Sequence, residues 1–97
     1  MPLYTLIGRD RKDGLAQRLA NRPAHLEHMA RLDAEGLVRF GGPLLDEQGE
    51  MAGSLIIIEA TDLESARATY EDDPYVIHGV FEHYDVVETT PIFPRKN

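Results

Sequence analysis

The feature that most constrains the fold is an uninterrupted apolar run, Leu55-Ile56-Ile57-Ile58, within residues 53–60. A short run rich in β-branched residues and bounded by glycine and polar residues favours a β-strand. Because neighbouring side chains of a strand point to opposite faces of its sheet, both faces of this strand are apolar. The run therefore predicts a central strand of a sheet that is covered on both sides.

The segments around this strand predict the order strand, helix, strand, strand, helix, strand. Strands are expected at residues 3–8, 37–40, 53–60 and 80–87, and helices at residues 14–35 and between residues 61 and 72. This βαββαβ order is typical of ferredoxin-like α+β folds, in which both helices lie on one face of a four-stranded antiparallel sheet.

The first helix carries apolar residues at roughly helical spacing and a proline in its middle. Proline removes a backbone donor and disfavours helix at the preceding residue. We therefore expect a break near Asn21-Arg22, with Pro23 opening a second helical piece. The apolar residues expected to face the core are Leu15, Leu19, Leu26, Met29 and Leu32.

Turn and cap residues delimit the other elements. The second strand is expected to end at Gly41-Gly42-Pro43, and the polar run 46–50 to turn the chain back into the third strand. Thr61, with Glu64 three residues on, has the form of a capping box for the second helix. Asp73 can cap a short helix or turn whose first residue is Pro74.

A chain of 97 residues corresponds to one domain, here residues 1–97 with a C-terminal tail at 91–97. Domains of this size leave much of their surface outside the core. The helix-free face of the sheet would be apolar, so we expect a second copy of the chain to cover it, giving a homodimer. The alternative is that the tail folds back across that face.

Composition argues against several classes of partner. Seventeen acidic and ten basic residues give a net charge of −7, which repels nucleic-acid backbones and anionic lipid surfaces. There is no cysteine, no signal-peptide pattern and no stretch of membrane-spanning length, so we expect a cytoplasmic protein. No phosphate loop or dinucleotide fingerprint is present, so no cofactor is expected.

The four histidines are the first candidates for proton transfer near neutrality. His25 falls beside the predicted buried stripe, where it could also be a core residue bonded to a backbone carbonyl. His25 and His28 are one turn apart, a spacing that suits two metal ligands, but no third ligand is evident and no metal site is predicted. His28 and His78 are expected to be solvated, and His83 to lie at the dimer face or sheet edge.

In a ferredoxin-like layout the two helices lie side by side. The turn after the second helix, which contains Asp73, can therefore approach residues early in the first helix. A carboxylate meeting His25 there would fix the tautomer of the imidazole and favour its charged form, making His25 a better base. Capping by Asp73 alone would equally explain the Asp-Pro sequence.

Four short motifs resemble the YciI-related (YCII domain) proteins, and they occur in the right order over nearly the whole chain. They are Arg22-Pro23-Ala24-His25-Leu26, Gly41-Gly42-Pro43-Leu44, Gly53-Ser54, and Asp72-Asp73-Pro74-Tyr75-Val76 followed by Gly79-Val80. The resemblance implies a dimeric α+β barrel with a His-Asp pair in a cleft of each subunit. Carried onto this chain, His25 and Asp73 take the catalytic roles, and Arg22, Ser54 and Tyr75 become substrate-binding neighbours.

The function predicted on this basis is a cofactor-independent enzyme that moves a proton during elimination, isomerisation or hydrolysis of a small organic substrate. A relative in the family eliminates chloride from a chlorinated hydroxyquinol, which makes a dehydrochlorinase-like lyase one form of this hypothesis. Arg22 would suit an anionic substrate group, because its planar fork can bind a carboxylate. Ser54 could act as a nucleophile or merely occupy a strand start.

Two other functions stay open. The protein could be a non-catalytic module that binds a small ligand or dimerises, with His25 and Asp73 as a buried polar pair. It could also be a cofactor-free oxygenase, which the same barrel hosts and which would consume oxygen with an electron-rich aromatic substrate. Turnover that disappears in His25→Ala would distinguish an enzyme from a binding module.

Overall fold

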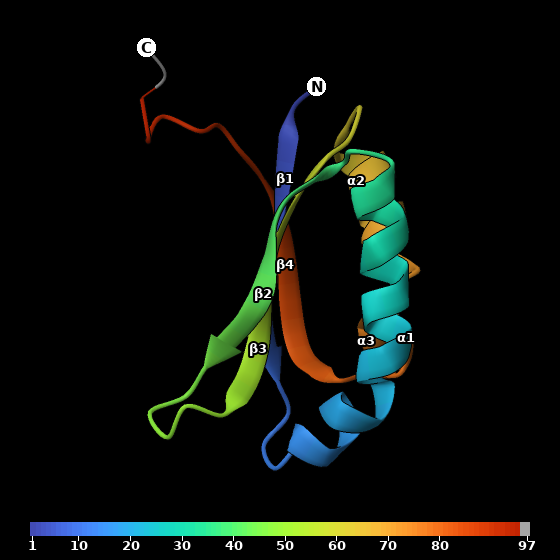
Figure 1. Ribbon diagram of the computed structural model, residues 1–97, viewed down its shortest axis with the longest axis vertical. Helices are drawn as coiled ribbons and strands as arrows, with labels where there is room; N and C mark the ends of the chain where they lie inside the picture. Colours follow the sequence, from blue (N-terminus) through green and yellow to red (C-terminus); the bar gives the residue numbers. More distant parts are fainter. Residues whose placement is uncertain (96–97) are drawn as a thin grey trace.

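A computed structural model describes residues 1–95 and has a four-stranded antiparallel sheet with all its helices on one face (Figure 1). The strand order is β2-β3-β1-β4. The elements are β1 (Leu3–Asp10), α1 (Leu15–Ala34), β2 (Val38–Leu45), β3 (Met51–Glu59), α2 (Leu63–Glu71), α3 (Pro74–Ile77) and β4 (Phe81–Thr89). The predicted ferredoxin-like order of strands and helices is confirmed, with the short helix α3 added before the last strand.

The core lies between the sheet and the helices. Leu6 of the inner strand β1 is opposite Ile56 on β3 and Val86 on β4, and all three side chains are buried toward the helices. Tyr70 of α2 lies against them, and its hydroxyl lies 2.8 Å from the carbonyl oxygen of Tyr4 and 3.0 Å from that of Ile56. The apolar run of β3 is therefore central, as predicted, and α2 is anchored to the backbone of the sheet.

The expected break in the first helix is wrong. The helix α1 continues through Pro23, and Figure 1 shows instead that its first turns, in blue, bend away from the axis of the rest. A proline inside a helix removes one hydrogen bond and commonly bends the helix without ending it.

The predicted buried stripe of α1 is also partly wrong. Leu19 and Leu26 are 50% and 45% exposed, whereas Arg18, His28 and Leu32 are buried. Buried residues at this spacing define one helix face, which includes Leu32 but is offset from Leu19 and Leu26. Arg18 can occupy it because its charge is paired with a carboxylate, a pairing that hydropathy alone does not predict.

Strand β2 runs past the expected stop and includes Gly41-Gly42-Pro43. It is an edge strand, where a proline that lacks an N–H does not interrupt a ladder on its solvent side. The predicted turn follows, with Asp46 Oδ1 accepting hydrogen bonds from the backbone N–H groups of Gln48 and Glu50.

The helix caps differ from the expectation at one of two positions. Asp62, and not Thr61, caps α2, because its carboxylate accepts a hydrogen bond of 2.8 Å from the backbone N–H of Ser65. Thr61 instead donates to the Ser65 hydroxyl. Asp73 caps α3 with Pro74 as the first helical residue, as predicted.

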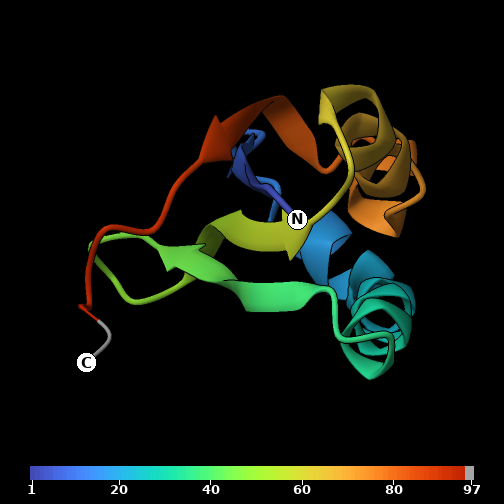
Figure 2. The same ribbon diagram turned by 90° about the horizontal axis from the view of Figure 1, so that it is seen from above.

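The helix-free face of the sheet is open in the single chain. Figure 2 shows the helices on one side of the sheet, and the tail after β4 leaving on the other. Ile7, Phe40 and Val87 are exposed on this face. Ile92 and Phe93 in the tail are 67% and 68% exposed, so the described tail does not cover the sheet, contrary to the alternative expectation. Residues 96–97 of the predicted tail lie outside the described residues.

Within residues 1–95, no helix is both long and apolar enough to cross a bilayer.

Candidate functional site

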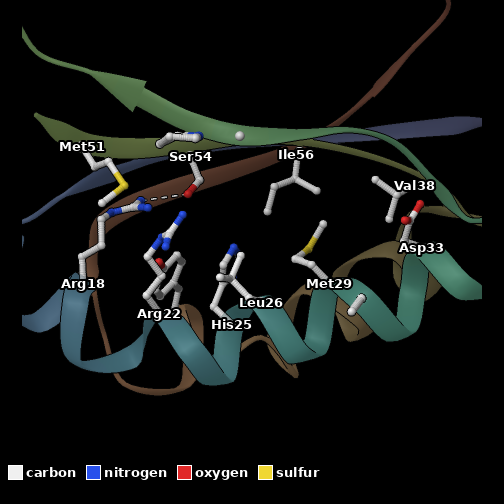
Figure 3. Close-up of a pocket in the computed structure, with 15 residues that line it drawn as sticks. Arg18, Arg22, His25, Leu26, Met29, Asp33, Val38, Met51, Ser54 and Ile56 are labelled. Atoms are coloured by element: carbon white, nitrogen blue, oxygen red, sulfur yellow. Dashed lines mark hydrogen bonds between the residues drawn. The ribbon is translucent and has the colours of Figure 1, made fainter. Parts of the chain in front are cut away.

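A pocket of about 370 Å³ lies between α1 and the β2–β3 half of the sheet (Figure 3). Its volume is in the range of small-molecule sites, about 300–1,000 Å³. The predicted site residues Arg22, His25, Ser54 and Tyr75 all line it. Asp73, which precedes α3, does not line the pocket itself but is hydrogen-bonded to His25. The structure thus brings together residues from α1, β3 and α3 that are far apart in the sequence.

His25 and Asp73 are in direct contact. The Nδ1 atom of His25 is 2.9 Å from both carboxylate oxygens of Asp73. The side chain of Asp73 is 1% exposed and that of His25 is 12% exposed, so the carboxylate is sealed while the imidazole reaches the pocket. With Nδ1–H donating to the carboxylate, the neutral ring carries its free lone pair on Nε2.

Local structure holds the carboxylate in place. Asp73 precedes Pro74 at the start of α3, and its Oδ1 also accepts a hydrogen bond of 2.9 Å from the backbone N–H of Tyr75. One buried carboxylate therefore both caps a helix and accepts a hydrogen bond from the histidine. Both interactions satisfy lone pairs that would otherwise be buried without partners.

Tyr75 stacks against the imidazole of His25. Its ring is stacked on that of His25, with centroids 3.9 Å apart and planes 11° from parallel. The guanidinium carbon of Arg18 lies 4.5 Å from the centroid of the same ring. Burial raises the pKa of the Tyr75 phenol, and the positive charge of Arg18 opposes part of that rise. Among the described residues, the phenol oxygen has no hydrogen-bond partner.

Arg18 and Asp10 belong to the site but were not predicted. Arg18 Nε and Nη2 donate to the Asp10 carboxylate at 2.7 and 3.1 Å, and Nη2 also donates to Ser54 Oγ at 2.8 Å. The side chains of Arg18 and Asp10 are 2% and 5% exposed. A signal was present in the sequence: Arg18 precedes His25 by seven residues, or two helical turns, and so shares its face.

The predicted substrate-binding residues differ in their surroundings. Ser54 is buried and its hydroxyl is hydrogen-bonded to Arg18. Within the described part of the chain, no imidazole bonds this hydroxyl as in an activated nucleophile. Arg22 is exposed at the mouth of the pocket, and Figure 3 shows its guanidinium directed toward the sheet. The ion pairs found within residues 1–95 do not involve Arg22.

The remaining histidines lie outside the pocket. The prediction that His28 is solvated is wrong: its side chain is buried between α1 and α2, and its Nε2 has no partner among the described residues. His78 is exposed, and His83 is exposed on the edge strand β4. His25 and His28 line different depressions, and residues 1–95 contain no group of three or more potential metal ligands.

Fold and pocket together define a ferredoxin-like α+β protein with a pocket against one half of its sheet. The model of the YCII-related domain matches residues 2–90, and the chain belongs to that family, as its motifs predicted.

Proteins of similar sequence align with most of the chain. It is 38% identical to protein YciI of Escherichia coli over 97 aligned residues, which cover 94% of this chain and 99% of YciI. It is 31% identical to an uncharacterized protein of Haemophilus influenzae, with 80% of this chain and 86% of that protein covered.

A solved structure also resembles the whole fold. It is the 5-chloro-2-hydroxyhydroquinone dehydrochlorinase of Burkholderia phenoliruptrix AC1100, in complex with 2,5-dihydroxybenzoquinone. The TM-score is 0.81 at 29% identity, with 91% of this chain and 93% of the enzyme covered.

Proposed function

We propose that the protein is a cofactor-independent enzyme in which His25, oriented by Asp73, transfers a proton to and from a small organic substrate. The observation that carries this proposal is the contact between His25 Nδ1 and the Asp73 carboxylate, at 2.9 Å to each oxygen, beside a pocket that the imidazole lines.

Each part of the pair has a distinct role. Asp73 accepts a hydrogen bond from Nδ1–H and so leaves the lone pair of Nε2 free to take a proton from a C–H or O–H group of the substrate. The imidazolium that forms is stabilised by the buried carboxylate against it. In an elimination, the electrons of the broken C–H bond form the new double bond, the leaving group departs with its own bonding pair, and His25 later releases the proton to solvent.

The surroundings favour a substrate that is anionic and contains a ring or other flat group. Arg22 offers a planar, doubly donating fork at the pocket mouth. The similar dehydrochlorinase was solved with a quinone, which supports a flat oxygenated ring as substrate and elimination as reaction class.

The decisive experiment is a screen for turnover with small acids, lactones and halogenated aromatics. We expect activity in the wild type, its loss in His25→Ala, and its retention in His28→Leu, which removes a histidine one turn away outside the pocket. Ligand binding without turnover on any substrate would instead support the non-catalytic binding module.

The same proposal includes a homodimer through the helix-free face. Ile7 on β1, Phe40 on β2 and Val87 on β4 leave apolar surface exposed on the helix-free face, and the described tail does not cover it. Light scattering after size-exclusion chromatography should give twice the mass of one chain. Val87→Arg should shift the protein to single chains, whereas Glu88→Arg, a charge change on the adjacent residue, should not. A wild-type mass of one chain would contradict the dimer. The cytoplasmic location stays a prediction.

A further inference from the structure

The pocket has two chemically different halves. Figure 3 shows the nitrogen-bearing side chains of Arg18, Arg22 and His25 toward one end of α1. Farther along α1 the pocket is lined by Met29, with Ile56 and Val38 on the facing strands. Catalysis at His25 uses only the first half. The second half is apolar next to the site and ends at the carboxylate of Asp33, beside Val38. The proposed proton transfer does not use this half.

The pocket is also larger than a single ring requires. An apolar cavity of about 150 Å³ is enough to hold benzene, whereas this pocket measures about 370 Å³. Along α1, Arg22 and Met29 are seven residues apart, which corresponds to about 10 Å at 1.5 Å per residue. A ligand that engages Arg22 with an acidic group therefore still has space beside Met29.

We infer that the site takes an acidic substrate with an apolar arm, the acidic group at Arg22 beside His25 and the arm between Met29 and Ile56. This inference rests on the proposed function for its assignment to a substrate, and it adds a specificity subsite. Burying the arm removes apolar surface from water on both partners, so affinity grows with arm length until the subsite is full.

Gly41 controls the width of the subsite. A Cβ atom at Gly41 would lie 3.3 Å from Met29 Cε, so any larger side chain there takes up the space beside the thioether. At Gly42, the next residue of β2, a Cβ atom would instead lie 3.6 Å from Cζ of the Phe40 ring. Gly42 also lines the pocket, but a side chain there would lie beside Phe40 on the helix-free face. Gly41→Val and Gly42→Val therefore add the same side chain to opposite faces of β2, and light scattering of Gly42→Val checks that its oligomeric state is that of the wild type.

Binding of straight-chain carboxylates from butanoate to decanoate, measured by isothermal titration calorimetry, tests this inference without any turnover. For the wild type, we expect affinity to rise by roughly two- to fourfold per methylene and then level off. Gly41→Val should abolish that rise and leave butanoate affinity within about twofold, whereas Gly42→Val should behave as the wild type. Arg22→Gln should weaken every carboxylate by a similar factor, and octylamine should bind the wild type at least about tenfold more weakly than octanoate.

Several results would overturn the inference. One is a wild-type affinity that does not depend on chain length. Another is an equal loss of the chain-length dependence in Gly41→Val and Gly42→Val. A third is octylamine binding as tightly as octanoate. Gly41→Ala and Met29→Phe provide milder ways to narrow the same space if Gly41→Val does not fold, as judged by its thermal unfolding. If carboxylate affinity depends on chain length but no substrate is turned over, the subsite is supported and only the proposed catalysis is contradicted.

Discussion

The phenol ring of Tyr75 lies parallel to the imidazole of His25, with centroids 3.9 Å apart, and the same phenol ring contacts the guanidinium of Arg18. One buried ring therefore fixes the position of two side chains that come from different turns of α1. The ring is brought there by α3, whose first turn is capped by Asp73, the residue that also binds His25.

Replacing Tyr75 by phenylalanine should not destabilise the protein. The substitution keeps the stacked ring and removes a buried hydroxyl that has no partner among residues 1–95, so the free energy of unfolding should stay equal or rise by about 1 kcal/mol. Tyr75→Ala also removes the ring and should cost about 3–5 kcal/mol. Urea unfolding measures both. A clear loss in Tyr75→Phe would mean that the hydroxyl has a partner, such as an ordered water.

Replacing Arg18 by methionine should cost about 3–5 kcal/mol, because it leaves the buried carboxylate of Asp10 without its partner. The matched control is Arg31→Met, which breaks an ion pair with Glu27 between side chains that are 66% and 76% exposed. That control should change stability by less than about 1 kcal/mol. Similar effects of the two substitutions in chemical denaturation would argue against a structural role for the Arg18–Asp10 pair.

Replacing His28 by leucine should raise the free energy of unfolding by about 1 kcal/mol, since a buried nitrogen without a partner is exchanged for an apolar group of similar size. Ligand affinity in the pocket should stay unchanged, because His28 does not line it. Thermal unfolding and calorimetric titration of the same sample check the two statements. A destabilised His28→Leu would show that the imidazole forms an interaction through Nε2.

Stability should fall at alkaline pH because of Tyr70. Burial raises the pKa of this phenol in the folded chain, whereas in the unfolded chain it titrates near its ordinary value of about 10. The contribution of the protonated Tyr70 phenol to the free energy of unfolding is complete below pH 10. As pH rises further, this free energy falls by up to about 1.4 kcal/mol per pH unit. Unfolding followed from pH 8 to 11 should show this decline, shallower in Tyr70→Phe. Tyr84→Phe, at a partly exposed position of β4, serves as the control.

The order of strands and helices along the chain could be predicted because each element carries its own pattern, and the apolar run of β3 indicated a central strand. The contact between His25 and Asp73 followed from the layout of the fold and from the family motifs. Burial along α1 could not be predicted from hydropathy, because Arg18 is buried through its pairing with Asp10 on another element. The same limit applies to His28, which is buried beside a depression lined by residues of α1 and α2. The catalytic roles of His25 and Asp73 stay predictions.

The cap of α3 has a consequence for when the site first exists. His25 and Asp73 are separated by 48 residues, and a helix of four residues does not form on its own in water. On the ribosome, the imidazole of a growing chain would therefore face solvent without its carboxylate until residues 73–77 had emerged and docked on α1. Nascent or clipped chains that lack this turn would lack the contact between His25 and Asp73, and with it the proposed catalysis.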